Sequence, residues 1–217
     1  MSQTVAFRSY VAAEDHGRAN FYALTSRLFA APPDAALLSA IASSPPLATD
    51  DDGAPLAMAW SRLIAASGVV DEESAKEEFE ALFGGVGKAQ INLHGSHQLT
   101  GFMMEKPLAE LRGMLATLGL SRVATQSVVE DHLSALCEVM RVLIVGGGEG
   151  EGEGEGGRMV PASIQTQREF FEAHIATWFE KCCTAIVKHS LANYYRVVAQ
   201  YVWEFLRIER ESFSVDF

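Results

Sequence analysis

One segment decides the fold of this chain, Leu191-Ala-Asn-Tyr-Tyr-Arg-Val-Val-Ala-Gln-Tyr-Val-Trp-Glu-Phe-Leu-Arg-Ile208. Its apolar side chains recur at steps of three and four residues, at Leu191, Tyr194, Tyr195, Val198, Val202, Phe205 and Ile208. This spacing places them on one face of a single long helix. Each such side chain contributes roughly 1.5–3 kcal/mol when fully buried, so we expect this face to form the central wall of the core.

The same helical period recurs through the rest of the chain and predicts an all-α fold, a single helical bundle of about nine to ten helices. We expect the main apolar stripes at 21–29, 34–41, 56–64, 71–83, 107–118, 128–145 and 170–186. Pro32, Gly68 and Gly119 are typical of helix ends, and Asp34 and Asp71 are typical of helix starts. The segment 86–98 shows no period, and we expect it to be a loop that lines a site.

A stretch of glycine and glutamate divides the sequence. In residues 146–160 the glycines leave the backbone free and four glutamates repel one another, which is typical of a flexible hinge. We therefore expect an N-terminal helical subdomain over 1–145 and a C-terminal helical subdomain over 161–217. Because such a hinge permits exchange of the C-terminal helices between protomers, we expect either a monomer or a domain-swapped homodimer.

Composition excludes several classes of protein. The 217 residues carry a net charge of −11, whereas a nucleic-acid binder needs a basic face. The first ten residues do not have the pattern of a signal peptide, and no apolar run approaches the ~20 residues of a membrane span. Three cysteines, two of them adjacent, form no disulfide framework. We expect a cytoplasmic protein that does not insert into a membrane and binds no nucleic acid.

The best candidate site lies in Ser127-Val-Val-Glu-Asp-His-Leu-Ser-Ala-Leu-Cys-Glu-Val-Met140. Ser127 and Glu130 have the spacing of a capping box, which predicts a helix start. His132 shares a stripe with Leu136 and Met140, so its ring is expected to face inward or along a groove wall, whereas Asp131 is expected to point towards water. A purely structural role for this acid and this histidine remains an alternative reading.

A second alternative is an enzyme or a nucleotide-binding protein. His94 and His97, together with Asp131 and His132, have the residue types of a metal-dependent phosphohydrolase site. No H-E-x-x-H or paired C-x-x-C accompanies them, so we expect no metal, no cofactor and no catalytic residue.

The order of motifs resembles the TorD/DmsD/NarJ family of molybdoenzyme maturation chaperones. The likeness covers roughly residues 18–210 and is carried by Phe21-Tyr-Ala-Leu-Thr-Ser-Arg-Leu-Phe29, Glu78-Phe-Glu-Ala-Leu-Phe-Gly84, His94-Gly-Ser-His-Gln-Leu-Thr-Gly-Phe-Met-Met-Glu-Lys-Pro107, Val129-Glu-Asp-His-Leu-Ser-Ala-Leu-Cys-Glu-Val-Met140, Phe170–Trp178 and Asn193–Phe205. The resemblance implies a cytoplasmic, non-catalytic, all-helical chaperone that binds an apo-molybdoenzyme or its twin-arginine leader peptide. It also implies that Asp131, His132 and Ser96 belong to the peptide site.

Such a leader combines two arginines with an apolar stretch. Asp131 with Glu130 or Glu138 offers carboxylates for the guanidinium groups. Exposed ion pairs contribute only ~0–1 kcal/mol each, whereas micromolar affinity needs ~8 kcal/mol. An apolar groove must therefore supply most of the affinity. Its expected walls are His132, Leu136 and Met140, together with Phe102 or Met103.

Overall fold

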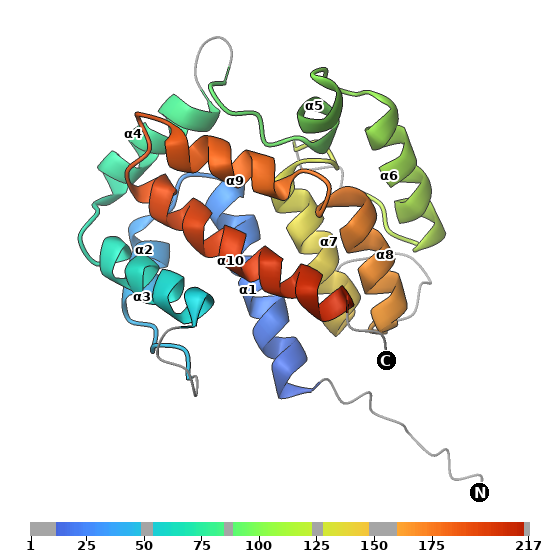
Figure 1. Cartoon of the computed structure of the whole chain (residues 1–217), viewed down its shortest axis with the longest axis horizontal. Coiled ribbons are helices and arrows are strands. Elements are labelled where there is room, and N and C mark those ends of the chain that lie inside the picture. Colours follow the sequence, from blue (N-terminus) through green and yellow to red (C-terminus); the bar gives the residue numbers. More distant parts are fainter. Residues whose placement is uncertain (1–11, 49–53, 85–88, 123–127, 148–159, 215–217) are drawn as a thin grey trace, which may run out of the picture.

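The computed structural model describes residues 12–48, 54–84, 89–122, 128–147 and 160–214. These residues form ten helices and no strand, which confirms the all-α prediction (Figure 1). In chain order the helices are α1 (Ala13–Ala30), α2 (Ala35–Ala42), α3 (Pro55–Ser67), α4 (Glu72–Phe83), α5 (Gly95–Thr100), α6 (Lys106–Thr117), α7 (Leu133–Val145), α8 (Ile164–His174), α9 (Phe179–Lys188) and α10 (Tyr194–Ser214).

Several helices begin where local side-chain chemistry predicts. Asp34 accepts the backbone N–H of Leu37 at 2.7 Å at the start of α2, and Asp71 accepts that of Ser74 at 2.8 Å at the start of α4. Each carboxylate satisfies a donor that the first turn leaves without a helical partner. Gly119, two residues beyond α6, has a φ of +69°, a conformation that favours glycine.

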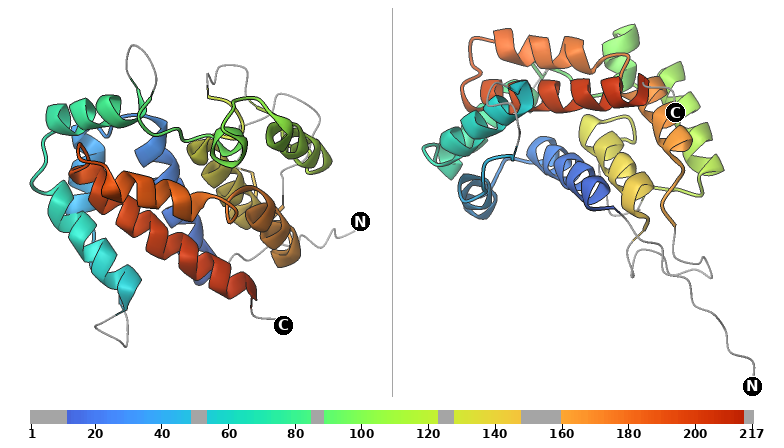
Figure 2. Two further views of the ribbon diagram at one scale, coloured as in Figure 1. Left: turned by 45° about the horizontal axis from the view of Figure 1, so that its top comes forward. Right: turned by 60° about the horizontal axis from the view of Figure 1, so that its bottom comes forward.

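The longest helix, α10, forms the central wall of the core, as its stripe predicts. Figure 2 shows α10 between α9 on one side and α1 and α7 on the other. Tyr195, Val198 and Val202 are fully buried along its length. The prediction is wrong at the two ends of the stripe, where the side chains are not buried. Leu191 is 54% exposed and lies before the helix begins, and Ile208 is 38% exposed.

Three other predicted boundaries are wrong. The stripe expected over 170–186 belongs to two helices, because the chain turns after His174 and α9 begins at Phe179. Trp178 stabilises this break, since its indole Nε1 donates to the carbonyl oxygen of His174 at 2.7 Å while the ring is buried. The helix expected from residue 128 begins at Leu133, and part of the loop expected over 86–98 is the short helix α5.

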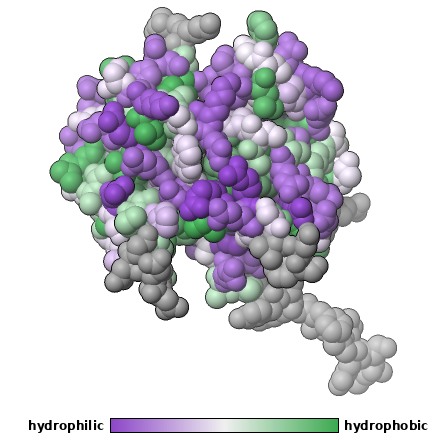
Figure 3. Space-filling view, viewed as in Figure 1, coloured by the Kyte–Doolittle hydropathy of each residue, from purple (hydrophilic) through white to green (hydrophobic). Residues whose placement is uncertain are grey.

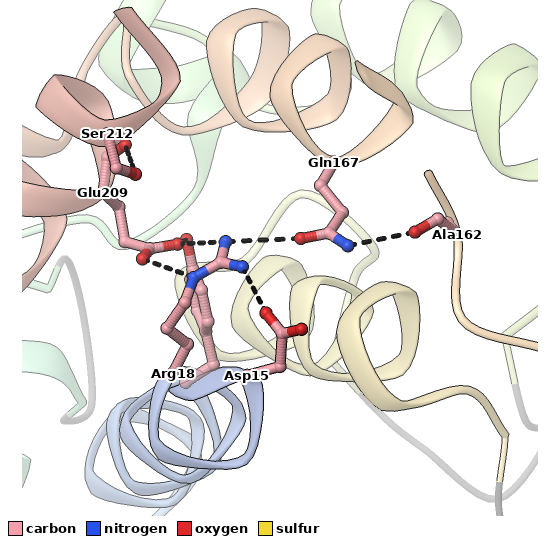
Figure 4. A network of polar contacts seen from close by, with 7 residues as sticks. Asp15, Arg18, Ala162, Gln167, Glu209 and Ser212 are labelled. Carbon is pink, nitrogen blue, oxygen red and sulfur yellow. Dashed lines mark hydrogen bonds and ion pairs between the residues drawn. The ribbon is translucent and has the colours of Figure 1, made fainter. Parts of the chain in front are cut away.

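A buried polar network joins α1 to α10 and α8 (Figure 4). The guanidinium of Arg18 binds both carboxylate oxygens of Glu209, at 2.8 and 2.9 Å, and also donates to Gln167. Tyr22 donates its hydroxyl to Glu209 at 3.0 Å, and Asp15 accepts from Arg18 on the outer side. Glu209 is only 3% exposed, so this pairing satisfies a charge that is otherwise costly to bury.

Polar contacts also connect the segments on either side of the expected hinge. The carboxylate of Glu78 on α4 accepts the backbone N–H groups of Asn193, Tyr194 and Tyr195 at 2.7–2.9 Å, at the start of α10. Most of the hinge itself, 148–159, lies outside the described residues, so the division into two subdomains stays a prediction. Among the described helices, none has the length and apolarity needed to cross a membrane.

Candidate functional site

The centre of the candidate site is a hydrogen-bonded pair, Ser96 and Asp131. Asp131 Oδ2 accepts the backbone N–H of Ser96 at 2.8 Å and its hydroxyl at 2.5 Å. The backbone carbonyl of Asp131 accepts the N–H of Gly95 at 2.8 Å. The start of α5 is thereby fixed to the segment that leads into α7. The structure brings together the serine and the aspartate that the resemblance assigns to one site.

The expectation that Asp131 points towards water is wrong. The residue is only 3% exposed, because the start of α5 covers it and supplies the donors that a buried carboxylate needs. Its second oxygen, Oδ1, is buried without a hydrogen-bond partner in the described part of the chain. A polar atom left in this state is unusual in a folded protein.

A small cavity of about 70 Å³ lies beside this carboxylate, and we call it the Asp131 slot. Its lining comes from α5, α6, α7, α8 and the segments beside them: Gly95, Ser96, Leu99, Pro107, Glu110, Leu111, Asp131, Leu136, Ala173, His174 and Trp178. Glu110 places a second carboxylate at the slot, where it pairs with Lys106 at 3.2 Å, and its side chain is 58% exposed. Burial lowers the pKa of His174, so this ring is neutral at neutral pH and leaves the slot acidic.

His132 caps α7 rather than lying within it. Its ring Nδ1 accepts the backbone N–H of Ser134 at 3.2 Å and lies 2.7 Å from the Ser134 hydroxyl. The His94 ring packs edge-on against it, with centroids 4.8 Å apart. Burial, and then the neighbouring His94, lower the pKa of His132 from 6.5 to about 4, and Asp131 opposes this in part. Burial also lowers the pKa of His94, so both rings are neutral at pH 7.

Glu130 and Glu138 lie at a different concavity. A groove of about 390 Å³ has an apolar lining that includes Leu115, Val139 and Val142, and it shares no lining residue with the Asp131 slot. Both glutamates line this groove, and both already have partners. Glu130 receives two hydrogen bonds from Arg112, and Glu138 receives three from Arg141.

Two predicted groove residues belong to the core instead. Leu136 is 1% exposed, and Met140 is fully buried. Leu136 lines the Asp131 slot. Met140 is not a groove wall, because the helix turns that face of α7 towards the core. The capping box of Ser127 with Glu130 lies partly outside the described residues, and Glu130 instead pairs with Arg112.

The turn between α5 and α6 carries an exposed apolar cluster. Leu99, Phe102, Met103 and Met104 are 46%, 69%, 37% and 71% exposed, and we call them the α5–α6 patch. Leu99 belongs both to this patch and to the lining of the Asp131 slot. Met104 has a φ of +60°, a conformation that is uncommon for any residue other than glycine. Sequence periodicity misses Leu99 and Met104, and the run Phe102-Met103-Met104 is the sequence signal that indicates the patch.

The histidines do not assemble into a metal site. Within the described residues, no group of three or more His, Cys, Asp or Glu side chains has an arrangement that could hold a metal ion. His94 instead uses its Nδ1 to contact the side-chain oxygen of Asn92 at 3.0 Å. The three cysteines are free and buried, and burial raises the pKa of each thiol, which leaves them unreactive.

Fold and site together describe an all-helical bundle protein that holds a buried, half-satisfied carboxylate at a narrow slot, with an exposed apolar patch at the neighbouring α5–α6 turn. The sequence matches the family described as nitrate reductase delta subunit over residues 49–184, well over half of the chain, and the protein belongs to that family. Its members are non-catalytic chaperones that mature molybdenum-cofactor oxidoreductases by binding their subunits. No curated protein sequence matches the chain.

Proposed function

We propose that this protein is a cytoplasmic chaperone that binds the twin-arginine leader, or another basic and apolar segment, of an apo-molybdoenzyme. One cationic side chain of that segment enters the Asp131 slot, and the neighbouring apolar residues lie on the α5–α6 patch. The protein itself catalyses no reaction. The observation that carries the proposal is that Asp131 lines the slot while its buried Oδ1 has no hydrogen-bond partner in the described part of the chain.

The slot has the size and charge for a cationic head group. A volume of about 70 Å³ corresponds to roughly two water molecules at about 30 Å³ each. A guanidinium or ammonium group that enters the slot donates a charge-assisted hydrogen bond to the Asp131 carboxylate. Ser96 already holds Oδ2, so the carboxylate is oriented before the ligand arrives, and little side-chain entropy is lost on binding.

The apolar patch supplies the remaining affinity. One buried charge-assisted hydrogen bond contributes about 1.5–3 kcal/mol, far below the ~8 kcal/mol of a micromolar complex. Phe102, Met103 and Met104 present large apolar side chains to solvent beside the slot. Flexible methionines accommodate apolar partners of varied shape. The net charge of −11 favours approach of a basic segment.

Calorimetry with a synthetic leader peptide tests the proposal. Asp131→Asn removes the charge with little change in shape and is expected to weaken binding at least tenfold, with an unchanged helical circular dichroism spectrum. Phe102→Ser is expected to weaken binding by a similar factor. Glu138→Gln is expected to have a smaller effect, because Glu138 is already paired with Arg141.

Glu77→Gln is the matched control, because Glu77 is an exposed carboxylate on α4, far from the slot in sequence. A leader peptide in which alanine replaces the arginines is expected to bind the wild-type protein and Asp131→Asn equally weakly. Full affinity of Asp131→Asn for the unmodified leader would show that the slot is not the peptide site.

A further inference from the structure

A third concavity lies on a different part of the molecule and carries the opposite charge. It is a groove of about 450 Å³ lined by residues of α3, α9 and α10: Pro55, Met58, Ala59, Arg62, Thr184, Val187, Lys188, Gln200, Trp203 and Glu204. It shares no lining residue with the Asp131 slot or with the groove of Glu130 and Glu138. In Figure 1, α10 lies between α9 and α3 on the near face. We call it the α3–α9–α10 groove.

Its surface combines apolar and basic side chains. Met58 is 42% exposed, and Val187 and Trp203 are half-buried in the wall. Arg62 and Lys188 are exposed, and neither forms an ion pair within the ranges that the structure describes. The acid of the groove, Glu204, is paired with Arg207 of its own helix at 3.0 Å. Figure 3 shows apolar patches between hydrophilic side chains on this face.

Two cations beside an apolar wall are complementary to a ligand with carboxylates beside an apolar face. The three helices present this wall as a groove, and an amphipathic helix lays its apolar side chains into such a groove at steps of three and four residues. The net charge of −11 repels an extended polyanion such as nucleic acid, whereas one or two carboxylates on a short helix need only the local charges of Arg62 and Lys188.

We propose that the α3–α9–α10 groove docks an acidic amphipathic helix of a partner protein, with its apolar side chains against Met58 and Trp203 and its carboxylates on Arg62 and Lys188. The groove is independent of the Asp131 slot, which takes a basic segment. The protein therefore presents two recognition surfaces of opposite charge preference.

Tryptophan fluorescence of the full chain reports this groove directly. The sequence has three tryptophans, and Trp60 and Trp178 are 7% and 2% exposed, so Trp203 is the one that a soluble quencher reaches most readily. The probe is a synthetic helix-forming peptide with leucines on one face and glutamates beside them. Its titration is expected to shift the emission to the blue in a saturable manner and to protect Trp203 from acrylamide. Trp203→Phe is expected to abolish both signals.

Charge reversal tests the role of the two cations. The double variant Arg62→Glu/Lys188→Glu is expected to bind the glutamate peptide at least tenfold more weakly. The control Arg27→Glu/Lys76→Glu makes the same change in net charge at exposed positions outside the groove, and it is expected to bind as the wild type does. A peptide with lysines in place of the glutamates is expected to give no Trp203 shift.

Three results would overturn the inference. The first is that the glutamate and lysine peptides bind equally well, and the second is that the Arg62/Lys188 variant binds the glutamate peptide with unchanged affinity. The third is a dimer that forms with rising protein concentration and that this variant abolishes, because such a dimer would assign the groove to a second copy of the chain. Leader binding is measured separately: Asp131→Asn is expected to keep glutamate-peptide affinity, and the Arg62/Lys188 variant is expected to keep leader affinity.

Discussion

Replacing Glu78 by alanine is expected to destabilise the whole bundle. Its carboxylate accepts three backbone N–H groups, of Asn193, Tyr194 and Tyr195, at the start of α10. Loss of an ordinary N-terminal cap costs about 0.5–2 kcal/mol, and a negative charge at a helix N-terminus contributes roughly a further 0.3–1 kcal/mol. Two of the three contacts are half-buried, so water replaces them poorly. We therefore expect a loss of about 2–3 kcal/mol in the free energy of unfolding.

Thermal and urea unfolding, followed by circular dichroism, measure this loss. For a chain of this size 1 kcal/mol lowers Tm by roughly 2–4 °C, so Glu78→Ala is expected to lower Tm by about 4–12 °C. Glu77→Ala is the matched control, since Glu77 is the preceding residue on the same helix and is exposed. It is expected to change stability by less than about 0.5 kcal/mol. If both variants lose the same small amount, the carboxylate of Glu78 does not hold the start of α10.

Three further predictions concern other parts of the molecule. Glu209→Ala leaves Arg18 buried without its main partner and is expected to lower the free energy of unfolding, measured in urea, by about 3–5 kcal/mol. Glu211→Ala removes an exposed ion pair on the same helix and is expected to lower it by less than about 1 kcal/mol. A similar loss in both variants would refute the role of the network. The pKa of His132 is about 4 in the folded state and 6.5 in the unfolded state, so the unfolded chain binds a proton more readily, and the free energy of unfolding is expected to fall by at most roughly 3 kcal/mol as the pH drops from 6.5 to 4. The variant His132→Asn keeps a capping oxygen and is expected to show a smaller dependence of stability on pH, whereas an unchanged dependence would contradict the role of His132. The hinge prediction is tested by light scattering over a range of concentrations, where a dimer that forms slowly and persists on dilution is expected from exchange of the C-terminal helices, and a single monomer mass throughout would count against exchange.

The helices were predictable from the sequence because their causes are local. Asp34 and Asp71 cap helices through residues three positions away, and the α10 stripe from Tyr194 to Phe205 buries itself at the helical period. The break between α8 and α9 was not predictable in this way, since it depends on a buried indole that donates to His174. Apolar periodicity continues through the break and suggests one helix where the structure has two.

The candidate site shows the same division. The proximity of Ser96 and Asp131 follows from the family resemblance, but the burial of Asp131 does not follow from its helical period. That burial depends on donors 35 residues earlier in the chain, at the start of α5. Glu130 and Glu138 were expected to meet a ligand because their charge is visible in the sequence. The pairing of Glu138 with Arg141 is a local i,i+3 contact that the helical period already allows, whereas the pairing of Glu130 with Arg112, 18 residues earlier, is visible only in the structure.

Comparison of three carboxylates shows why Asp131 is the one to test. Glu209 is as deeply buried as Asp131, and both of its oxygens have partners, Arg18 and Tyr22. Glu78 has three backbone donors on its two oxygens. The same fold therefore satisfies both oxygens of two structural carboxylates, whereas Asp131, which lines the slot, keeps one buried oxygen without a partner in the described residues. A carboxylate with a purely structural role gains nothing from that arrangement, since a further donor would stabilise it. The proposed role of Asp131, in which it receives a cation from another protein, accounts for it.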